Sequence, residues 1–152
     1  MRIDFYLTTK EEQNAIWLLA CRLIEKAYLK GHRVYIHCKD QNDAEFLDDL
    51  LWTFKDDSFI PHNLQGEGPE PSPPVQIGFA HEPRGFNYIL INMADPIPPF
   101  YSRFKRIIEI IAANENAKVV GRNHYRFYRA KGGELHSHSI EESKIETSDA
   151  II

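Results

Sequence analysis

The sequence has few cysteines and no disulfide framework. Only Cys21 and Cys38 occur in 152 residues, whereas small disulfide-stapled domains carry several pairs. Cys21 lies in a stretch with helical spacing and Cys38 ends a strand-like run, so we expect two reduced, structural thiols. The fold therefore depends on a hydrophobic core, which a hydrophobic fraction of 43% can supply.

Long apolar segments are also missing. The first residues, MRIDFYLTTKEEQ, contain no basic region followed by an apolar stretch, as a signal peptide would. No window approaches the ~18 uninterrupted apolar residues of a membrane span. We expect a cytoplasmic protein with no membrane contact, and 152 residues fit one domain.

Motifs of nucleotide-dependent and metal-dependent enzymes are absent or incomplete. The first predicted strand leads into its helix through LTTKEEQ, without the GxGxxG turn that admits a pyrophosphate. The pair Gly66 and Gly68 is followed by proline instead of a helix start. His136 and His138 have no accompanying Cys pair or HExxH helix, so we expect neither metal nor cofactor.

Two other histidines are weak candidates for catalysis. His37 precedes Cys38, but adjacent strand residues face opposite sides of a sheet and cannot readily exchange a proton. His62 lies in a predicted loop with no carboxylate assigned to orient it. We expect no catalytic site; a small nucleotide-dependent or hydrolytic enzyme is the alternative, supported only by the α/β alternation and scattered histidines.

The apolar pattern alternates between strand-like runs and helical spacing. Short β-branched and aromatic runs predict strands at residues 3–7, 33–38, 75–80 and 88–93. Spacings of three and four predict helices at residues 11–30, 40–53, 104–111 and 118–130. This alternation predicts an α/β fold, a single three-layer Rossmann-like domain with a largely parallel central sheet and helices on both faces.

The end of the sequence differs from the rest. From residue 134 onward it is polar and acidic with little apolar patterning, so packing would not offset the entropy of ordering it. We therefore place the domain at residues 1–135 and expect an acidic, flexible tail over residues 136–152.

Charge is strongly segregated although the net charge is only −4. Residues 40–57 carry seven acids against Lys55, and residues 101–131 carry eight bases against Glu109 and Glu115. Separate charged regions of this kind steer partners more than they affect the fold. We expect the basic region to bind an acidic partner.

The basic region contains a regular stripe. Lys118, Arg122 and Arg126 are spaced by four and share one face of the predicted last helix, with Tyr125 and Arg129 beside them. Guanidinium groups bind carboxylates, while alkyl stems and a tyrosine ring pack against an apolar side chain. An acidic peptide with an apolar end is the predicted ligand; a merely solvated helix face and single-stranded nucleic acid are the alternatives.

One segment resembles a known family. The stretch WTFKDDSFIPHNLQGEGP, residues 52–69, is similar to the chi subunit of bacterial DNA polymerase III, in which a tryptophan precedes SF-aliphatic-PHNL-x-GEGP. RNHYRFYR, residues 122–129, resembles the arginine and paired-tyrosine segment near the carboxyl end of that family. The resemblance covers roughly the first 135 residues.

The resemblance implies a non-catalytic accessory subunit of DNA replication. Chi subunits join the psi subunit, and through it the clamp loader, to the acidic C-terminal tail of single-stranded-DNA-binding protein, so the association with DNA is indirect. The matching positions for that tail are Lys118, Arg122, Tyr125 and Arg126, with Ile111 at the apolar wall. Arg126 stands where the family commonly has a lysine, which keeps the charge but changes its geometry.

The resemblance implies a second partner site. Trp52, Phe59 and the adjoining Pro61 match positions implicated in binding psi or an alternative helicase partner. The alternative is that these aromatic residues are ordinary core residues. The acidic ending from residue 141 departs from the shorter pattern of the family and could compete for the basic stripe.

Overall fold

The computed structural model describes residues 1–9 and 14–140. Those residues form one sheet of seven parallel strands in the order β3-β4-β2-β5-β6-β1-β7. The strands are β1 (Arg2–Thr8), β2 (Val34–His37), β3 (His62–Leu64), β4 (Val75–Gly78), β5 (Ile89–Asn92), β6 (Arg106–Ile111) and β7 (Glu134–Ile140). The helices are α1 (Ala15–Leu29), α2 (Gln41–Thr53), the short 3₁₀ helix η1 (Tyr101–Arg103) and α3 (Glu115–Ala130).

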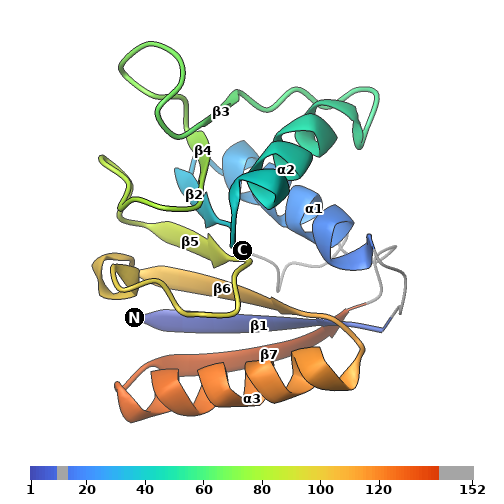
Figure 1. Cartoon of the computed structure of the whole chain (residues 1–152), viewed down its shortest axis with the longest axis vertical. Coiled ribbons are helices and arrows are strands. Elements are labelled where there is room, and N and C mark those ends of the chain that lie inside the picture. Colours follow the sequence, from blue (N-terminus) through green and yellow to red (C-terminus); the bar gives the residue numbers. More distant parts are fainter. Residues whose placement is uncertain (10–13, 141–152) are drawn as a thin grey trace.

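The three layers follow from strand alternation. Tyr6 and Ile108 point to the face covered by α1 and α2, whereas Phe5 and Ile107 point to the face that packs against α3. Figure 1 shows α3 lying along β7 and β1, at the other end of the molecule from α2 and β3. The predicted three-layer Rossmann-like α/β fold is confirmed, and within the described residues the sheet is entirely parallel.

Local sequence signals fix the helix ends. The Asp40 side chain accepts a hydrogen bond of 2.9 Å from the backbone N–H of Asp43 and caps α2. Asn114 caps α3 in the same way through the N–H of Ala117. Gly31, with a φ of +82°, follows α1 in the left-handed conformation that glycine adopts at least cost.

The predicted helix at residues 104–111 is wrong. The segment forms β6, between β5 and β1 in the middle of the sheet. Its sequence RIIEII places apolar side chains on both faces, which satisfies helical spacing and a doubly buried parallel strand equally well. Six mostly β-branched residues are too short for a typical helix and suit a strand.

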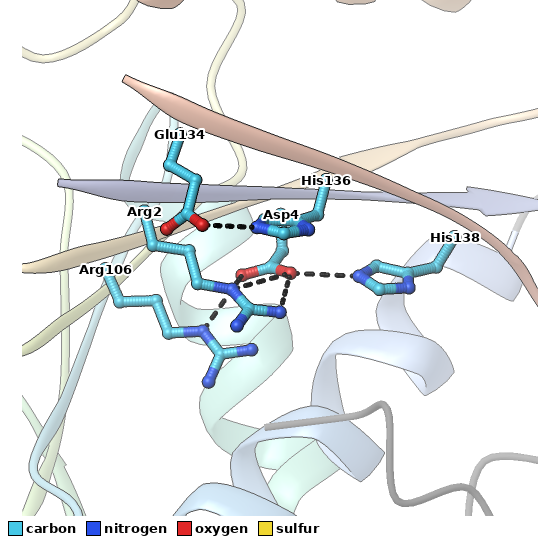
Figure 2. Close-up of polar contacts among 6 residues, drawn as sticks. All are labelled: Arg2, Asp4, Arg106, Glu134, His136 and His138. Carbon is cyan, nitrogen blue, oxygen red and sulfur yellow. Dashed lines mark hydrogen bonds and ion pairs between the residues drawn. The ribbon is translucent and has the colours of Figure 1, made fainter. Parts of the chain in front are cut away.

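The predicted flexible tail begins too early, because residues 134–140 form β7 beside β1. Figure 2 shows the side chains that join these strands: the His138 ring lies 2.9 Å from a carboxylate oxygen of Asp4, which also pairs with Arg2 and Arg106. The same ring stacks on Tyr6, with centroids 4.7 Å apart. His136 and His138 are therefore strand residues; residues 141–152 lie outside the described part.

Candidate partner-binding surfaces

A groove lies between α3 and the adjacent ends of β6 and β1. Its volume is about 220 Å³, and its floor is apolar because Phe5, Leu7 and Ile111 line it. The ring of Tyr125 lies 5.5 Å from that of Phe5 and closes one side. We call this cavity the α3 groove; its lining residues are Phe5, Leu7, Ile111, Lys118, Gly121, Arg122, Tyr125 and Ser137.

The α3 groove has a cationic rim. Lys118 and Arg122 lie one turn apart on the exposed side of α3. The Lys118 ammonium lies 4.0 Å from Glu115, but that glutamate is 81% exposed, so the pair is weak and leaves the lysine available to a ligand. Two bases above an apolar floor suit a peptide that carries carboxylates beside an apolar side chain.

The predicted stripe is only partly in the groove. Four of the positions named from the resemblance line it together: Ile111, Lys118, Arg122 and Tyr125. Arg126 does not line it; a guanidinium nitrogen of this exposed side chain lies 3.5 Å from the side-chain amide oxygen of Asn123. Position 126 is therefore better placed to attract a ligand through its charge than to touch it.

Four of the residues that line the groove were not predicted from the sequence. Phe5, Leu7 and Ser137 come from strands on which no ligand contact was predicted, and Gly121 looks like an ordinary helix residue. The alternation in IDFYL already indicates that Phe5 and Leu7 share a face. Only the strand order, which brings β1 and β7 beneath α3, identifies that face as a groove.

A buried polar cluster fixes the orientation of α3 beneath the groove. The Glu109 carboxylate accepts hydrogen bonds from the Asn92 amide at 3.0 Å and the Tyr128 hydroxyl at 2.8 Å, and it lies 2.9 Å from His124 Nδ1. His124 Nε2 bonds the carbonyl of Asp95. Burial alone would lower the pKa of His124, yet the Glu109 carboxylate and the Asp95 carbonyl raise it. Both carboxylate oxygens and both ring nitrogens are thus engaged within the protein.

The cysteines and the histidines that the sequence analysis weighed for catalysis are poorly placed for it. Burial raises the pKa of both the Cys21 and Cys38 thiols to about 12, which keeps them protonated at neutral pH. Cys38 packs on the α1 and α2 side, whereas the His37 ring contacts Phe100 on the other side. His62 lies in β3, not in a loop, and its ring nitrogens face the carbonyls of Ile60 and Asp48. The Asp48 carboxylate, which was not assigned from the sequence, also lies 3.2 Å from Nε2, but the His62 ring is buried.

A second surface lies at the end of α2. Trp52 is 48% exposed and Phe59 is 68% exposed, so these aromatic residues are not core residues. Their ring centroids are 5.7 Å apart, and Trp52 also packs on the buried His62 ring at 4.2 Å. Pro61 lies half-buried between Ile60 and His62. We call Trp52, Phe59 and Pro61 the aromatic surface; exposed aromatic rings on a rigid support are typical of protein interfaces.

The α3 groove and the aromatic surface lie at opposite ends of the sheet. Trp52 and Phe59 flank β3, the first strand in spatial order, and the groove lies beside β7, the last. Figure 1 shows this separation between the ends of the molecule that carry β3 and α3. The two surfaces therefore share no residue.

Two kinds of feature are absent from the described residues. None of their helices combines the length and the hydrophobicity of a membrane-spanning helix. Across residues 1–9 and 14–140, no three His, Cys, Asp or Glu side chains gather in a way that could hold a metal ion.

Comparison with known proteins identifies the family. Residues 1–136 match the family described as DNA polymerase III chi subunit, HolC. The chain is 36% identical to the DNA polymerase III subunit chi of Pseudomonas aeruginosa over 139 residues, which are 91% of this chain and 96% of that protein. It is 32% identical to the Escherichia coli subunit chi over 138 residues, covering 88% and 94% of the two chains, and 28% identical to that of Haemophilus influenzae over 139 residues, covering 90% and 96%. The chain therefore belongs to the family of DNA polymerase III chi subunits, which are accessory subunits of DNA replication.

Proposed function

We propose that this protein is a non-catalytic, cytoplasmic adaptor. Its α3 groove binds the acidic C-terminal tail of single-stranded-DNA-binding protein, and its aromatic surface binds the psi subunit, or a helicase in place of psi. The observation that carries the proposal is the α3 groove, in which Lys118 and Arg122 stand above an apolar floor. Through psi the domain would reach the clamp loader, and its association with DNA is indirect.

The apolar lining of the groove favours a peptide over single-stranded nucleic acid. Single-stranded nucleic acid needs a basic track with stacking rings along it, whereas here most of the lining is apolar and enclosed between α3 and β1. A labelled oligonucleotide in fluorescence anisotropy tests direct binding, which should fall steeply with salt. A panel of nucleotides that gives no thermal shift would argue against the enzyme alternative.

Arg122→Ala tests the groove. Removing one charge-assisted hydrogen bond should cost about 1.5–3 kcal/mol, which weakens binding of an acidic peptide ending in phenylalanine by roughly 10- to 150-fold. Arg126→Ala is the matched control, since it removes the same charge from the same helix outside the lining. In calorimetry at two salt concentrations, Arg126→Ala should lose less affinity for the peptide than Arg122→Ala, and the loss in Arg126→Ala should be smaller at the higher salt concentration. Equal losses in the two variants would move the binding site away from the groove.

Trp52→Ala and Phe59→Ala test the aromatic surface. Aromatic residues that become buried in an interface often contribute about 2 kcal/mol or more to binding. Either variant should therefore weaken the affinity for psi by at least about 30-fold, which would appear as loss of co-purification with psi. Phe46→Ala is the control, because Phe46 is a 41% exposed aromatic residue on α2 that packs on Trp17 instead. Unchanged psi binding by both test variants would place that interface elsewhere.

A further inference from the structure

The sequence contains a second candidate ligand for the α3 groove. Residues 141–152 read EESKIETSDAII and lie outside the described residues. They carry four acids against Lys144, and Asp149 is followed closely by Ile151 and Ile152. Carboxylates beside apolar side chains are also the chemistry of the ligand proposed above for Lys118, Arg122 and the groove floor.

We propose that the α3 groove also binds the chain's own segment 146–152, with Ile151 and Ile152 on the apolar floor and Asp149 near the cationic rim. This inference rests on the proposed function, because it assigns a competing ligand to the same groove. Bound in this way, the segment is a built-in competitor of any acidic peptide that approaches from another protein.

The point at which the segment leaves the fold favours binding within one chain. Ser137 of β7 lines the groove, and β7 ends only three residues later, at Ile140, about 10 Å further along the strand. If residues 146–152 are bound, residues 141–145 remain as a tether of five residues, and a flexible chain of that length would have an average end-to-end distance of about 11–13 Å. A tether whose length is close to the span it must cross gives an effective concentration in the millimolar range.

The effective concentration of the segment determines how strongly it competes with an external peptide. At an effective concentration of about 1 mM, a segment that binds with a dissociation constant of about 0.1–1 mM occupies the groove half of the time or more. The apparent affinity for an external peptide then falls in proportion to the free fraction, by about two- to tenfold. Such a competitor suppresses weak or isolated acidic ligands and yields to stronger or locally concentrated ones.

The first test detects occupancy without any external peptide. Ile151→Ser with Ile152→Ser removes the two apolar side chains proposed to lie on the floor, and Ile145→Ser is the matched control just before the bound segment. The Ile111 methyl and Gly121 amide NMR signals should shift in the double variant relative to wild type and stay unchanged in the control. The chemical shifts of the wild-type protein should not depend on protein concentration between about 0.05 and 0.5 mM, because this range lies below the effective concentration of about 1 mM within one chain. Identical spectra of wild type and double variant, or concentration-dependent shifts, would overturn binding within one chain.

The second test separates this inference from the proposed function. In calorimetry, the double variant should bind an acidic peptide ending in phenylalanine about two- to tenfold more tightly than wild type. Equal affinity for wild type and double variant contradicts the internal competitor and leaves the proposed function intact. If neither chain binds the peptide, the proposed function fails, and the NMR comparison alone decides whether segment 146–152 occupies the groove.

Discussion

Gly121 determines how closely α3 approaches the floor of the groove. A Cβ atom at this position would lie 2.7 Å from Cδ1 of Ile111 and 3.2 Å from its Cγ1. Both distances are shorter than an ordinary van der Waals contact, so any larger residue must displace the isoleucine side chain. The absence of a single methyl group at position 121 therefore keeps the apolar floor open.

Gly121→Ala should reduce peptide binding more than stability. The helix gains about 1 kcal/mol in propensity, which offsets much of the cost of moving Ile111, so the melting temperature should change by only a few degrees. The displaced side chain narrows the groove, and affinity for an acidic peptide should fall by at least about fivefold, or roughly 1 kcal/mol. Calorimetry and thermal unfolding measure both, with Asn123→Ala as an exposed control on α3. If Gly121→Ala binds the peptide with wild-type affinity, the displaced Ile111 side chain does not narrow the groove.

At the scale of single elements, a buried carboxylate links β7 to β1 in addition to the strand pairing, because His138 of β7 lies 2.9 Å from Asp4 of β1. Asp4 is completely buried in β1 and pairs with Arg2, Arg106 and His138, which come from three neighbouring strands. Burial would raise the pKa of Asp4, but the hydrogen bonds from Arg2 and His138 and the charge of Arg106 lower it below its usual value. The ionised form is therefore the one that joins β7 to the sheet.

This arrangement predicts a defined pH dependence. Because the pKa of Asp4 is lower in the folded than in the unfolded chain, its stabilisation is present above about pH 4 and is lost as pH falls through the folded pKa. Asp4→Asn leaves Arg106 without its partner and should cost about 3–5 kcal/mol at pH 7. Urea unfolding across pH should show the difference between wild type and variant shrinking below about pH 4. Asp57→Asn, at an exposed acid, should show no such loss; a constant difference at all pH values would exclude Asp4 ionisation as its source.

At the scale of the whole molecule, strand order separates the two proposed partner surfaces. β3 and β7 are the two edges of a seven-stranded sheet, so six strand spacings of ~4.8 Å place them roughly 29 Å apart. Sites at this distance with no shared contacts usually act independently. The fold therefore suits a bridge in which both partners bind at once.

Independent binding can be measured directly. Saturation of the aromatic surface with psi should change the dissociation constant of an acidic peptide at the α3 groove by less than about twofold. Trp52→Ala should likewise leave peptide binding unchanged, and Arg122→Ala should leave psi binding unchanged. Calorimetry of the peptide against the preformed complex makes the comparison. Mutual exclusion of psi and peptide would mean that the two surfaces overlap or are coupled through the domain.

The sequence by itself determined the fold class and the face of α3 that carries Lys118, Arg122 and Tyr125, because these depend on local spacing. It did not determine β6 or β7. RIIEII fits two periods, and the polar strand ELHSHSI is held beside β1 partly by a hydrogen bond between His138 and Asp4 and by stacking of the same ring on Tyr6. Only the tertiary structure decided that Phe5, Leu7 and Ser137 meet α3, that Arg126 lies outside the groove, and that Trp52 and Phe59 are exposed. These features depend on strand order, which arises from contacts between residues far apart in the chain.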